Sequence, residues 1–350
     1  MKILHSADWH LCSPLQGRSE AQTQLLKAHL LQIPGKVTAL CRAEGCDMML
    51  LSGDLFDGPY DADTFRVLYK ALEEAAVPVL ITPGNHDFAD PNSPWLTQRF
   101  PENVHIFTRP VIESVDVPSL GCRVYGAGFT AMDCPPLLED FHAAADLPAI
   151  GVLHGDPTQN ASPYNPITQA QVRQSGLLYL ALGHIHKGGS FRSGNTLCAW
   201  PGCPMGRGYD EEGEKGVLIV TIEDTVTTRF VPLGTPQFFD LECTPAELES
   251  LLPPVGNQHF YRITLTGESE ALDLAELMVR YARFPNLELR DRTVPPVDIW
   301  RTLGEDSFEG TYFGLLHNAF ASADEETQRK LKLAAKISRQ ILDGQEVTLP

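Results

Sequence analysis

The feature of this sequence that most constrains the fold is an apolar run ending in aspartate, asparagine or histidine, which occurs five times before residue 190. Side chains at the carboxyl ends of strands in an open α/β sheet face one crevice, so residues far apart in the sequence can meet there. Glycines beside them allow tight turns. The five segments are Asp8-Trp9-His10, Gly53-Asp54, Gly84-Asn85-His86-Asp87, Leu153-His154-Gly155 and Gly183-His184-Ile185-His186. The pattern predicts an α/β fold with one polar site at the strand ends.

The first ninety residues alternate short apolar stretches with helical ones, which predicts a β-α-β-α-β order. Helices are expected over about 21–41, with an interruption at Pro34, and over 63–76, while strands are expected over 47–51 and 77–81. This alternation implies a mostly parallel sheet with helices on both faces. Later strands are expected at 122–125, 149–153, 178–182, 196–199 and 217–222.

The pattern of apolar and polar residues changes after about residue 231. A small separate α/β unit is indicated by an expected helix, strand, helix and strand at 245–252, 259–266, 271–284 and 287–290. Two helices follow the break at Pro295-Pro296. Ser322 and Glu325 are expected to form a capping box for the last helix, and Gly344 is expected to end it. The predicted domains are 1–235, 236–295 and 296–350.

Composition limits the kinds of function that the chain can have. Its formal net charge of −18 favours solubility and works against non-specific adhesion to nucleic acid, which depends on phosphate contacts. The N-terminus does not resemble an export signal, and no run of roughly 18 apolar residues occurs, so we expect a cytoplasmic protein. The eight cysteines form no Cys-x-x-Cys pair, which favours reduced structural thiols over a zinc ribbon or a disulfide framework.

The candidate ligands are of the kinds that hard or borderline divalent cations prefer, because they comprise two carboxylates, one amide oxygen and four imidazoles, without a thiolate. They are Asp8, His10, Asp54, Asn85, His154, His184 and His186. Two ions about 3.5–4 Å apart, bridged by a carboxylate such as Asp54, would clamp a phosphate and acidify a bound water. The predicted reaction is phosphoester hydrolysis, in which a metal-bridged hydroxide attacks phosphorus.

Each segment taken alone also has a purely structural interpretation. The Gly-Asn-His-Asp segment at 84–87 suits a turn, because Asn, Asp and Gly all favour such positions. His154 by itself would more often be a hydrogen-bonded core histidine. His184 and His186 carry more weight, since two imidazoles stand at alternating positions directly after a strand. All five segments in order at strand ends favour a metal site.

In this order the segments resemble the signatures of the calcineurin-like metallophosphoesterase superfamily, over roughly residues 1–235. The resemblance implies a β-sandwich core flanked by helices and a centre of two divalent metal ions. It implies one ion held by Asp8, His10, Asp54 and His186, and a second held by Asp54, Asn85, His154 and His184. His86 would be the catalytic residue, which contacts the scissile phosphate and supports proton transfer to the leaving oxygen.

Within that superfamily the chain is similar to the bacterial SbcD-type DNA repair exonucleases. The similarity rests on residues 3–11, on Gly53-Asp54-Leu55-Phe56-Asp57, and on Asp87 after Asn85-His86, where phosphatases tend to carry Glu. It implies DNA as the substrate, a small α/β capping domain and C-terminal helices that dock an SbcC-like coiled-coil ATPase. It also implies Mn²⁺, with Mg²⁺ or Fe²⁺ as alternatives, and a homodimer. Asp57 departs from the histidine that some members carry, so a DNA-contacting role is not carried over to it.

Two other functions stay open at this point. One is a nucleotide or small-molecule phosphodiesterase on the same core, and the other is an adaptor subunit whose main task is to hold the ATPase. Among secondary residues, Asp87 is expected either to orient a ligand histidine or to serve a turn. His5 is expected to be structural. Residues 207–213 are expected to form a solvated loop, with an approach of Arg207 and Tyr209 to the substrate as the alternative.

Overall fold

A computed structural model describes residues 1–15, 19–345 and 347 of the chain, and the first of its two units is built on two six-stranded sheets. That unit comprises Met1–Asp240, Pro254–Arg262 and Arg283–Glu288, and the second comprises Leu241–Pro253, Ile263–Ala282 and Leu289–Pro350. The predicted domain ranges 1–235, 236–295 and 296–350 stay predictions, and residues 16–18, 346 and 348–350 within them lie outside the described residues.

The first sheet has the strand order β12-β11-β1-β2-β3-β4. Strands β1 to β4 run parallel, whereas β11 pairs antiparallel with β1 and β12 antiparallel with β11. The strands are β1 (Lys2–Ser6), β2 (Met48–Ser52), β3 (Val79–Thr82), β4 (Val104–Ile106), β11 (Gly216–Ile222) and β12 (Val226–Pro232). The expected parallel order of the first three strands is therefore present.

The second sheet has the order β5-β6-β7-β8-β10-β9. Its four inner strands are parallel, and both edge strands are antiparallel to their neighbours. The strands are β5 (Glu113–Val117), β6 (Cys122–Gly126), β7 (Ala149–His154), β8 (Tyr179–Gly183), β9 (Lys187–Ser193) and β10 (Thr196–Gly202).

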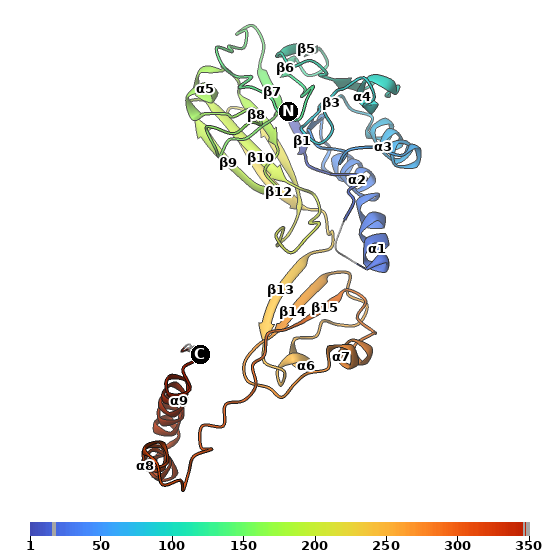
Figure 1. Ribbon diagram of the computed structural model, residues 1–350. Helices are drawn as coiled ribbons and strands as arrows, with labels where there is room; N and C mark the ends of the chain where they lie inside the picture. The colour runs from blue at the N-terminus through green and yellow to red at the C-terminus, as the bar shows by residue number, and fades with distance from the viewer. Residues whose placement is uncertain (16–18, 346, 348–350) are drawn as a thin grey trace. The chain divides into compact units, whose positions relative to one another are not determined.

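The two sheets pack face to face, and helices α1 (Glu20–Leu30), α2 (Ile33–Glu44) and α3 (Ala62–Ala75) cover the other face of the first sheet (Figure 1). Strand residues alternate between these environments, because successive side chains of a strand point to opposite faces. Leu51 packs in the cluster that contains helix residues, and Leu50 packs in the cluster between the sheets. The expectation of helices on both faces was wrong, because the second sheet covers one of them.

The helices that cover the first sheet begin at residues that favour the start of a helix. Ser19 forms a capping box with Gln22 at α1, and Pro34 stands in the first turn of α2, where its missing N–H has no intrahelical partner to lose. Asp61 caps α3 by accepting from two backbone N–H groups. The described residues of the first unit also form two short helices, α4 (Pro94–Thr97) and α5 (Gln169–Gln174).

A three-stranded sheet of order β13-β14-β15 follows, with two short helices beside it in the sequence. Its elements are β13 (Phe238–Cys243), α6 (Leu248–Leu251), β14 (Phe260–Leu265), α7 (Leu274–Arg280) and β15 (Leu287–Asp291). The expected alternation of helix and strand over 245–290 is present. Strand β13 was missed, because its alternating pattern of buried and exposed residues is short.

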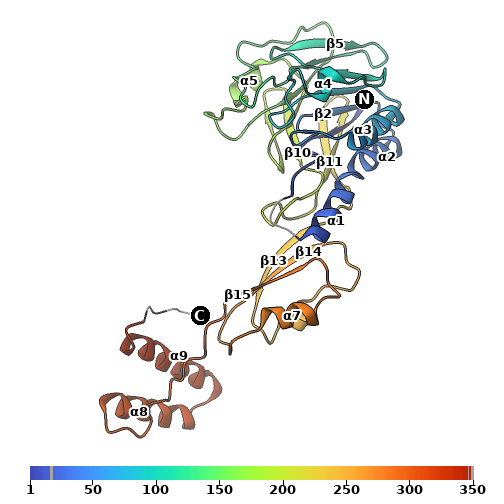
Figure 2. The same cartoon turned by 45° about the vertical axis from the view of Figure 1, so that its right-hand side comes forward.

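The chain then forms a pair of helices, α8 (Phe308–Ser322) and α9 (Glu325–Leu342), which pack on each other (Figure 2). Arg339 is buried in this pair, with its guanidinium 3.8 Å from the Phe313 ring centre and paired with Glu309. Asp324, not Ser322, caps α9, so the predicted capping box was placed two residues too early. No helix in the described part of the chain is both long and apolar enough to span a membrane.

Candidate metal centre

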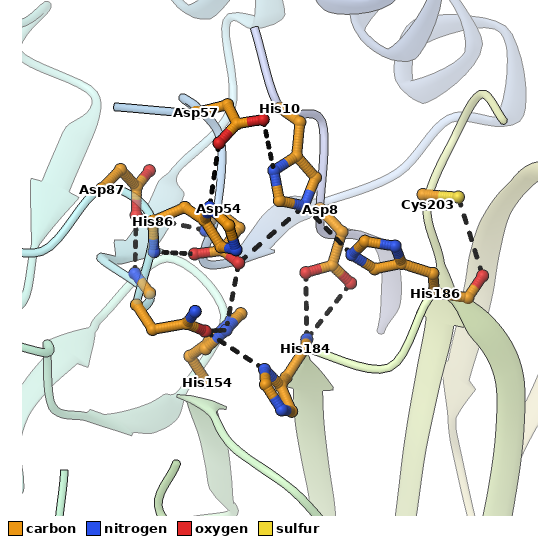
Figure 3. Close-up of polar contacts among 12 residues, drawn as sticks. Asp8, His10, Asp54, Asp57, His86, Asp87, His154, His184, His186 and Cys203 are labelled. Atoms are coloured by element: carbon orange, nitrogen blue, oxygen red, sulfur yellow. Dashed lines mark hydrogen bonds and ion pairs between the residues drawn. The ribbon is translucent and has the colours of Figure 1, made fainter. Parts of the chain in front are cut away.

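The polar segments of the five strands meet at one place in the first unit (Figure 3). Asp8, Asp54 and Asn85 follow the carboxyl ends of β1, β2 and β3, while His154 ends β7 and His184 follows β8. A hydrogen bond from His154 Nδ1 to the Ser52 carbonyl, 2.9 Å long, joins the two sheets beside them. The seven predicted ligands and His86 are therefore brought together.

Asp54 lies at the middle of this cluster. Its Oδ2 lies 3.4 Å from His154 Nε2 and 3.9 Å from His10 Nε2, and its Oδ1 accepts the backbone N–H of His86 at 2.9 Å. Four groups of described side chains offer ligand atoms within 4.8 Å of one another, and two of these groups contain Asp8, namely Asp8 with His10 and His186, and Asp8 with Asp54 and His154. Two ligand atoms about 2.1 Å from one ion can be up to about 4.2 Å apart, so the separations of 3.4 and 3.9 Å from Asp54 Oδ2 suit a shared cation on either side.

The first set of metal-type donors comprises the side chains of Asp8, His10 and His186. His10 Nε2 and His186 Nε2 are 3.0 Å apart, and both oxygens of Asp8 accept the backbone N–H of His184 at 3.0 and 3.2 Å. Burial raises the pKa of the Asp8 carboxyl, an effect that the nearby His186 and His154 oppose. A bound cation would hold this buried carboxyl in its ionised form.

The second set of donors is centred on Asn85. Its Oδ1 lies 2.9 Å from His154 Nε2 and 3.1 Å from His184 Nδ1. Because His154 Nδ1 donates to the Ser52 carbonyl, Nε2 is the ring atom left to act as a ligand, and it faces the Asn85 amide oxygen. Both atoms can offer an electron pair toward the same point. This arrangement of acceptors fits a divalent cation, which would accept electron pairs from both.

Two of the imidazoles, those of His10 and His184, are held in the form that binds metal. Burial lowers the pKa of His10 well below its usual range, and burial followed by the neighbouring His154 lowers the pKa of His184 to about 4. Both rings are therefore neutral near pH 7 and keep a lone pair for a ligand. The metal-ligand roles of the seven residues stay predictions.

The backbone at the site is strained. Asp8, His10, Asp54 and His184 all have positive φ angles, of 55°, 48°, 53° and 100°. Such values are uncommon for residues other than glycine and gather at functional sites, where the surrounding structure holds them. Gly84 is required for space, because a Cβ there would lie 2.2 Å from Asp54 Oδ1.

Asp87 holds the backbone that carries Asp54. Its Oδ1 accepts the N–H of Gly84 at 2.7 Å, and its Oδ2 accepts the N–H groups of Leu55 and Phe56 at 2.8 and 3.2 Å. Burial, followed by the charge of Asp54, raises the pKa of Asp87 to about 7. These hydrogen bonds of Asp87 hold the turns that carry Asp54 and Asn85, and a role in orienting a ligand histidine stays a prediction.

His86 is oriented by a carboxylate that the sequence left without a role. Its Nδ1 lies 2.9 Å from Asp57 Oδ1, and this hydrogen bond raises the pKa of the His86 imidazole against the lowering effect of burial. A ring held by Nδ1 keeps its Nε2 for another partner. In the sequence, the only sign of a role for Asp57 is its position three residues after Asp54. The contact between Asp57 and His86 is seen only in the folded structure.

The loop at residues 207–213 is not solvated as expected, because two of its side chains reach the site. Glu211 Oε1 lies 2.5 Å from His186 Nδ1, and Arg207 Nη1 lies 3.1 Å from Asp57 Oδ2. Although burial opposes it, the hydrogen bond to His186 lowers the pKa of Glu211 to about 2, and the bond to Glu211 raises the pKa of His186. Arg207 also donates its backbone N–H to Glu211 at 2.6 Å, so the loop links His186 with the Asp57–His86 pair.

His5 has the structural role that was predicted for it. The ring is buried, with Nδ1 2.7 Å from the Tyr179 hydroxyl and Nε2 2.8 Å from the Ser52 hydroxyl. Burial lowers its pKa to about 3. The neutral ring therefore supports the floor of the site, directly behind the β2 strand end.

Comparison with known proteins gives matches in the same region. A family model described as calcineurin-like phosphoesterase matches residues 1–188. The chain is 31% identical over 240 residues to the uncharacterized metallophosphoesterase YhaO of Bacillus subtilis, a match that covers 63% of this chain and 57% of that protein. It is 25% identical over 266 residues to the SbcD subunit of the nuclease SbcCD from the same species, covering 63% of this chain and 66% of that protein.

A third relative matches over more of the chain. The SbcD subunit of the nuclease SbcCD from Staphylococcus epidermidis is 24% identical over 331 residues, which cover 82% of this chain and 84% of that protein. The matches to the two Bacillus subtilis proteins span less than two thirds of the length of either.

Proposed function

The chain belongs to the calcineurin-like phosphoesterase family, and from this premise we propose that it is a two-metal phosphodiesterase that cleaves DNA. The observation that carries the proposal is the placement of Asp54 between two sets of metal-type donors, one at His10 and one at His154. A carboxylate in that position can bridge two ions. The family match supports hydrolysis of a phosphoester, and the geometry supports two ions as its cofactors.

The proposed ligand sets follow the two groups of donors. The first ion would be held by Asp8, His10, Asp54 and His186, and the second by Asp54, Asn85, His154 and His184. The mixture of imidazole, carboxylate and amide ligands suits Mn²⁺ or a similar divalent ion. Bound there, two such ions would neutralise the charge of a phosphate and lower the pKa of an attacking water.

The remaining chemistry belongs to side chains of this protein. His86 is the proposed general acid, because Asp57 holds its Nδ1 and raises its pKa, which keeps a proton on the ring for the leaving oxygen. Glu211 orients His186 through the hydrogen bond to Nδ1, as carboxylates commonly do for ligand histidines. Arg207 fixes Asp57 and Glu211 relative to each other.

DNA is the proposed substrate because two of the named relatives are subunits of a nuclease. Those names also support an SbcC-like coiled-coil ATPase as a partner. The described helix α8 offers a surface for it, since Phe308 is 75% exposed and Leu315 is 68% exposed. A net charge of −18 is poorly suited to gripping duplex DNA alone, so a partner would supply the basic surface. A homodimer stays a prediction.

Hydrolysis of labelled linear duplex, single-stranded DNA and bis-p-nitrophenyl phosphate, with Mn²⁺ or with EDTA, tests the proposal. We expect Mn²⁺-dependent shortening of DNA, and a loss of about 100- to 10,000-fold in His86→Ala. Cleavage of the small diester with intact DNA would move the substrate to nucleotides or to DNA presented by a partner. No Mn²⁺-dependent hydrolysis of any substrate would contradict the enzyme function and favour an adaptor.

The partner proposal has its own test. Phe308→Ser and Leu315→Ser should abolish co-purification with a co-expressed SbcC-like ATPase while hydrolysis of bis-p-nitrophenyl phosphate stays at the level of the unaltered protein. Retention of the ATPase by both variants would remove α8 from the interface.

A further inference from the structure

A cavity of about 440 Å³ opens beside His86, in the range of volumes that small-molecule sites occupy. Aromatic and proline side chains from two segments form its walls, chiefly Tyr60 and Phe88 with Pro59 and Pro94. We propose that this cavity is a nucleobase site, which receives the base of the nucleotide that leaves during cleavage. The inference rests on the proposed phosphodiesterase function and names the group that the enzyme recognises next to the phosphate.

The aromatic wall is held in place before any ligand binds. The Tyr60 hydroxyl accepts the Gln98 amide at 2.9 Å, and its ring centre lies 5.7 Å from Phe56 and 5.9 Å from Phe65. On the other wall, Phe88 follows Asp87, whose backbone carbonyl accepts the Trp95 indole N–H at 2.5 Å, and this bond holds the backbone beside Phe88. The Tyr60 ring, held by its hydroxyl and by its ring neighbours, offers a base a stacking surface at little cost in conformational entropy.

The charges of the cavity select a neutral ring over a phosphate. Its described lining contains two acidic residues, Asp87 and Asp90, and no lysine or arginine. Because the Asp87 carboxylate accepts the backbone N–H groups of Gly84, Leu55 and Phe56, Asp90 supplies the negative charge, and a phosphate bound away from His86 would meet it without a lysine or arginine as partner. Asn92 supplies an amide with both donor and acceptor atoms, which suits the polar edge of a base.

The position of His86 assigns the cavity to the leaving side of the phosphate. The same imidazole lines the cavity and belongs to the candidate metal centre. With Nδ1 held by Asp57, its Nε2 is the atom that would donate a proton to the leaving oxygen. The leaving nucleotide therefore emerges beside His86, and its base is the part of the substrate that reaches Tyr60 and Phe88.

A double-mutant cycle tests this assignment, in which a base is removed from the substrate and an aromatic ring is removed from the protein. The substrates are thymidylyl-thymidine and two analogues in which one or the other base is replaced by hydrogen, assayed with Mn²⁺. Phe88→Ala should raise KM for the complete dinucleotide about tenfold, as expected for the loss of one base–aromatic stack. One of the two analogues should show the same rise with the unaltered protein and no further rise with Phe88→Ala.

Two further variants keep the test decisive. Phe88→Leu retains apolar volume without a stacking face and should raise KM in the same way, which separates lost stacking from a damaged fold. Phe230→Ala removes another exposed aromatic ring, which lines a different cavity on the His186 side, and should leave KM for the dinucleotide unchanged.

The outcomes distinguish this inference from the function on which it rests. Cleavage of the dinucleotide with additive effects of base removal and Phe88→Ala for both analogues would overturn the base site alone. Cleavage of bis-p-nitrophenyl phosphate but of neither dinucleotide nor DNA would overturn the base site together with the DNA substrate.

Discussion

Replacing Glu211 with glutamine should weaken binding of one Mn²⁺ ion about tenfold and leave the other ion unchanged. Glu211 Oε1 lies 2.5 Å from His186 Nδ1, which fixes the ring proton there and leaves the Nε2 lone pair beside His10 Nε2, 3.0 Å away. Losing such a carboxylate partner typically costs 10- to 100-fold in metal affinity. Tenfold corresponds to about 1.4 kcal/mol.

Glutamine should give the smaller loss, because its carbonyl can still accept from His186 while its amide meets the Arg207 N–H that Glu211 now accepts at 2.6 Å. Glu211→Ala removes both bonds and should approach a 100-fold loss. Calorimetric titration of metal-free protein with MnCl₂ resolves the two affinities, and thermal unfolding checks that each variant is folded.

Glu212→Gln is the matched control, because it removes the same charge from a neighbouring exposed residue and should bind both ions as the unaltered protein does. Equal Mn²⁺ affinities in Glu211→Gln, Glu211→Ala and Glu212→Gln would refute the assignment of Glu211 as the partner of a metal-binding His186.

Three further changes have definite expected results. Gly84→Ala places a Cβ 2.2 Å from Asp54 Oδ1 and should abolish binding of at least one Mn²⁺ ion, as measured by calorimetry. Gly35→Ala is the control, because the space around Gly35 is open, and it should bind both ions normally. Normal Mn²⁺ binding in both variants would contradict the packing argument. Asp57→Asn replaces the charged acceptor that raises the pKa of His86 with a neutral one, so the alkaline limb of the pH–rate profile should move to lower pH. A limb at the same pH in both proteins would exclude His86 as the general acid. Burial lowers the pKa of His5 to about 3. Between about pH 6.5 and 3 the His5 ring is therefore protonated in the unfolded chain and neutral in the folded protein, so the free energy of unfolding falls as the pH falls. His5→Gln should therefore reduce the loss of unfolding free energy between pH 7 and 5 by about 2 kcal/mol in urea titrations, and an equal loss in both proteins would reject this.

The strand ends were predictable because their signals are local. An apolar run followed by Asp, Asn or His marks a buried strand that ends at a polar crevice, and all five such segments converge on Asp54. The break at Pro34 and the helix over 62–75 were likewise predictable, since proline, capping residues and apolar spacing act within one or two turns.

The features that sequence missed depend on contacts between distant segments. Strands that are apolar on both faces, such as β2, look the same whether helices or a second sheet cover them, so the sandwich could be inferred only by resemblance. The acidic stretch around Glu211 is typical of a solvated loop, and its contact with His186, 25 residues away, has no local signal. Ser322 and Asp324 are both good caps two residues apart, so local pattern did not distinguish them.

The central claim is a two-metal centre bridged by Asp54, and the most direct measurement is a crystal structure of Mn²⁺-loaded protein with anomalous data collected at the manganese edge. The account predicts two anomalous peaks in contact with Asp54, one among Asp8, His10 and His186 and the other among Asn85, His154 and His184. A single peak, or peaks that Asp54 does not contact, would contradict it.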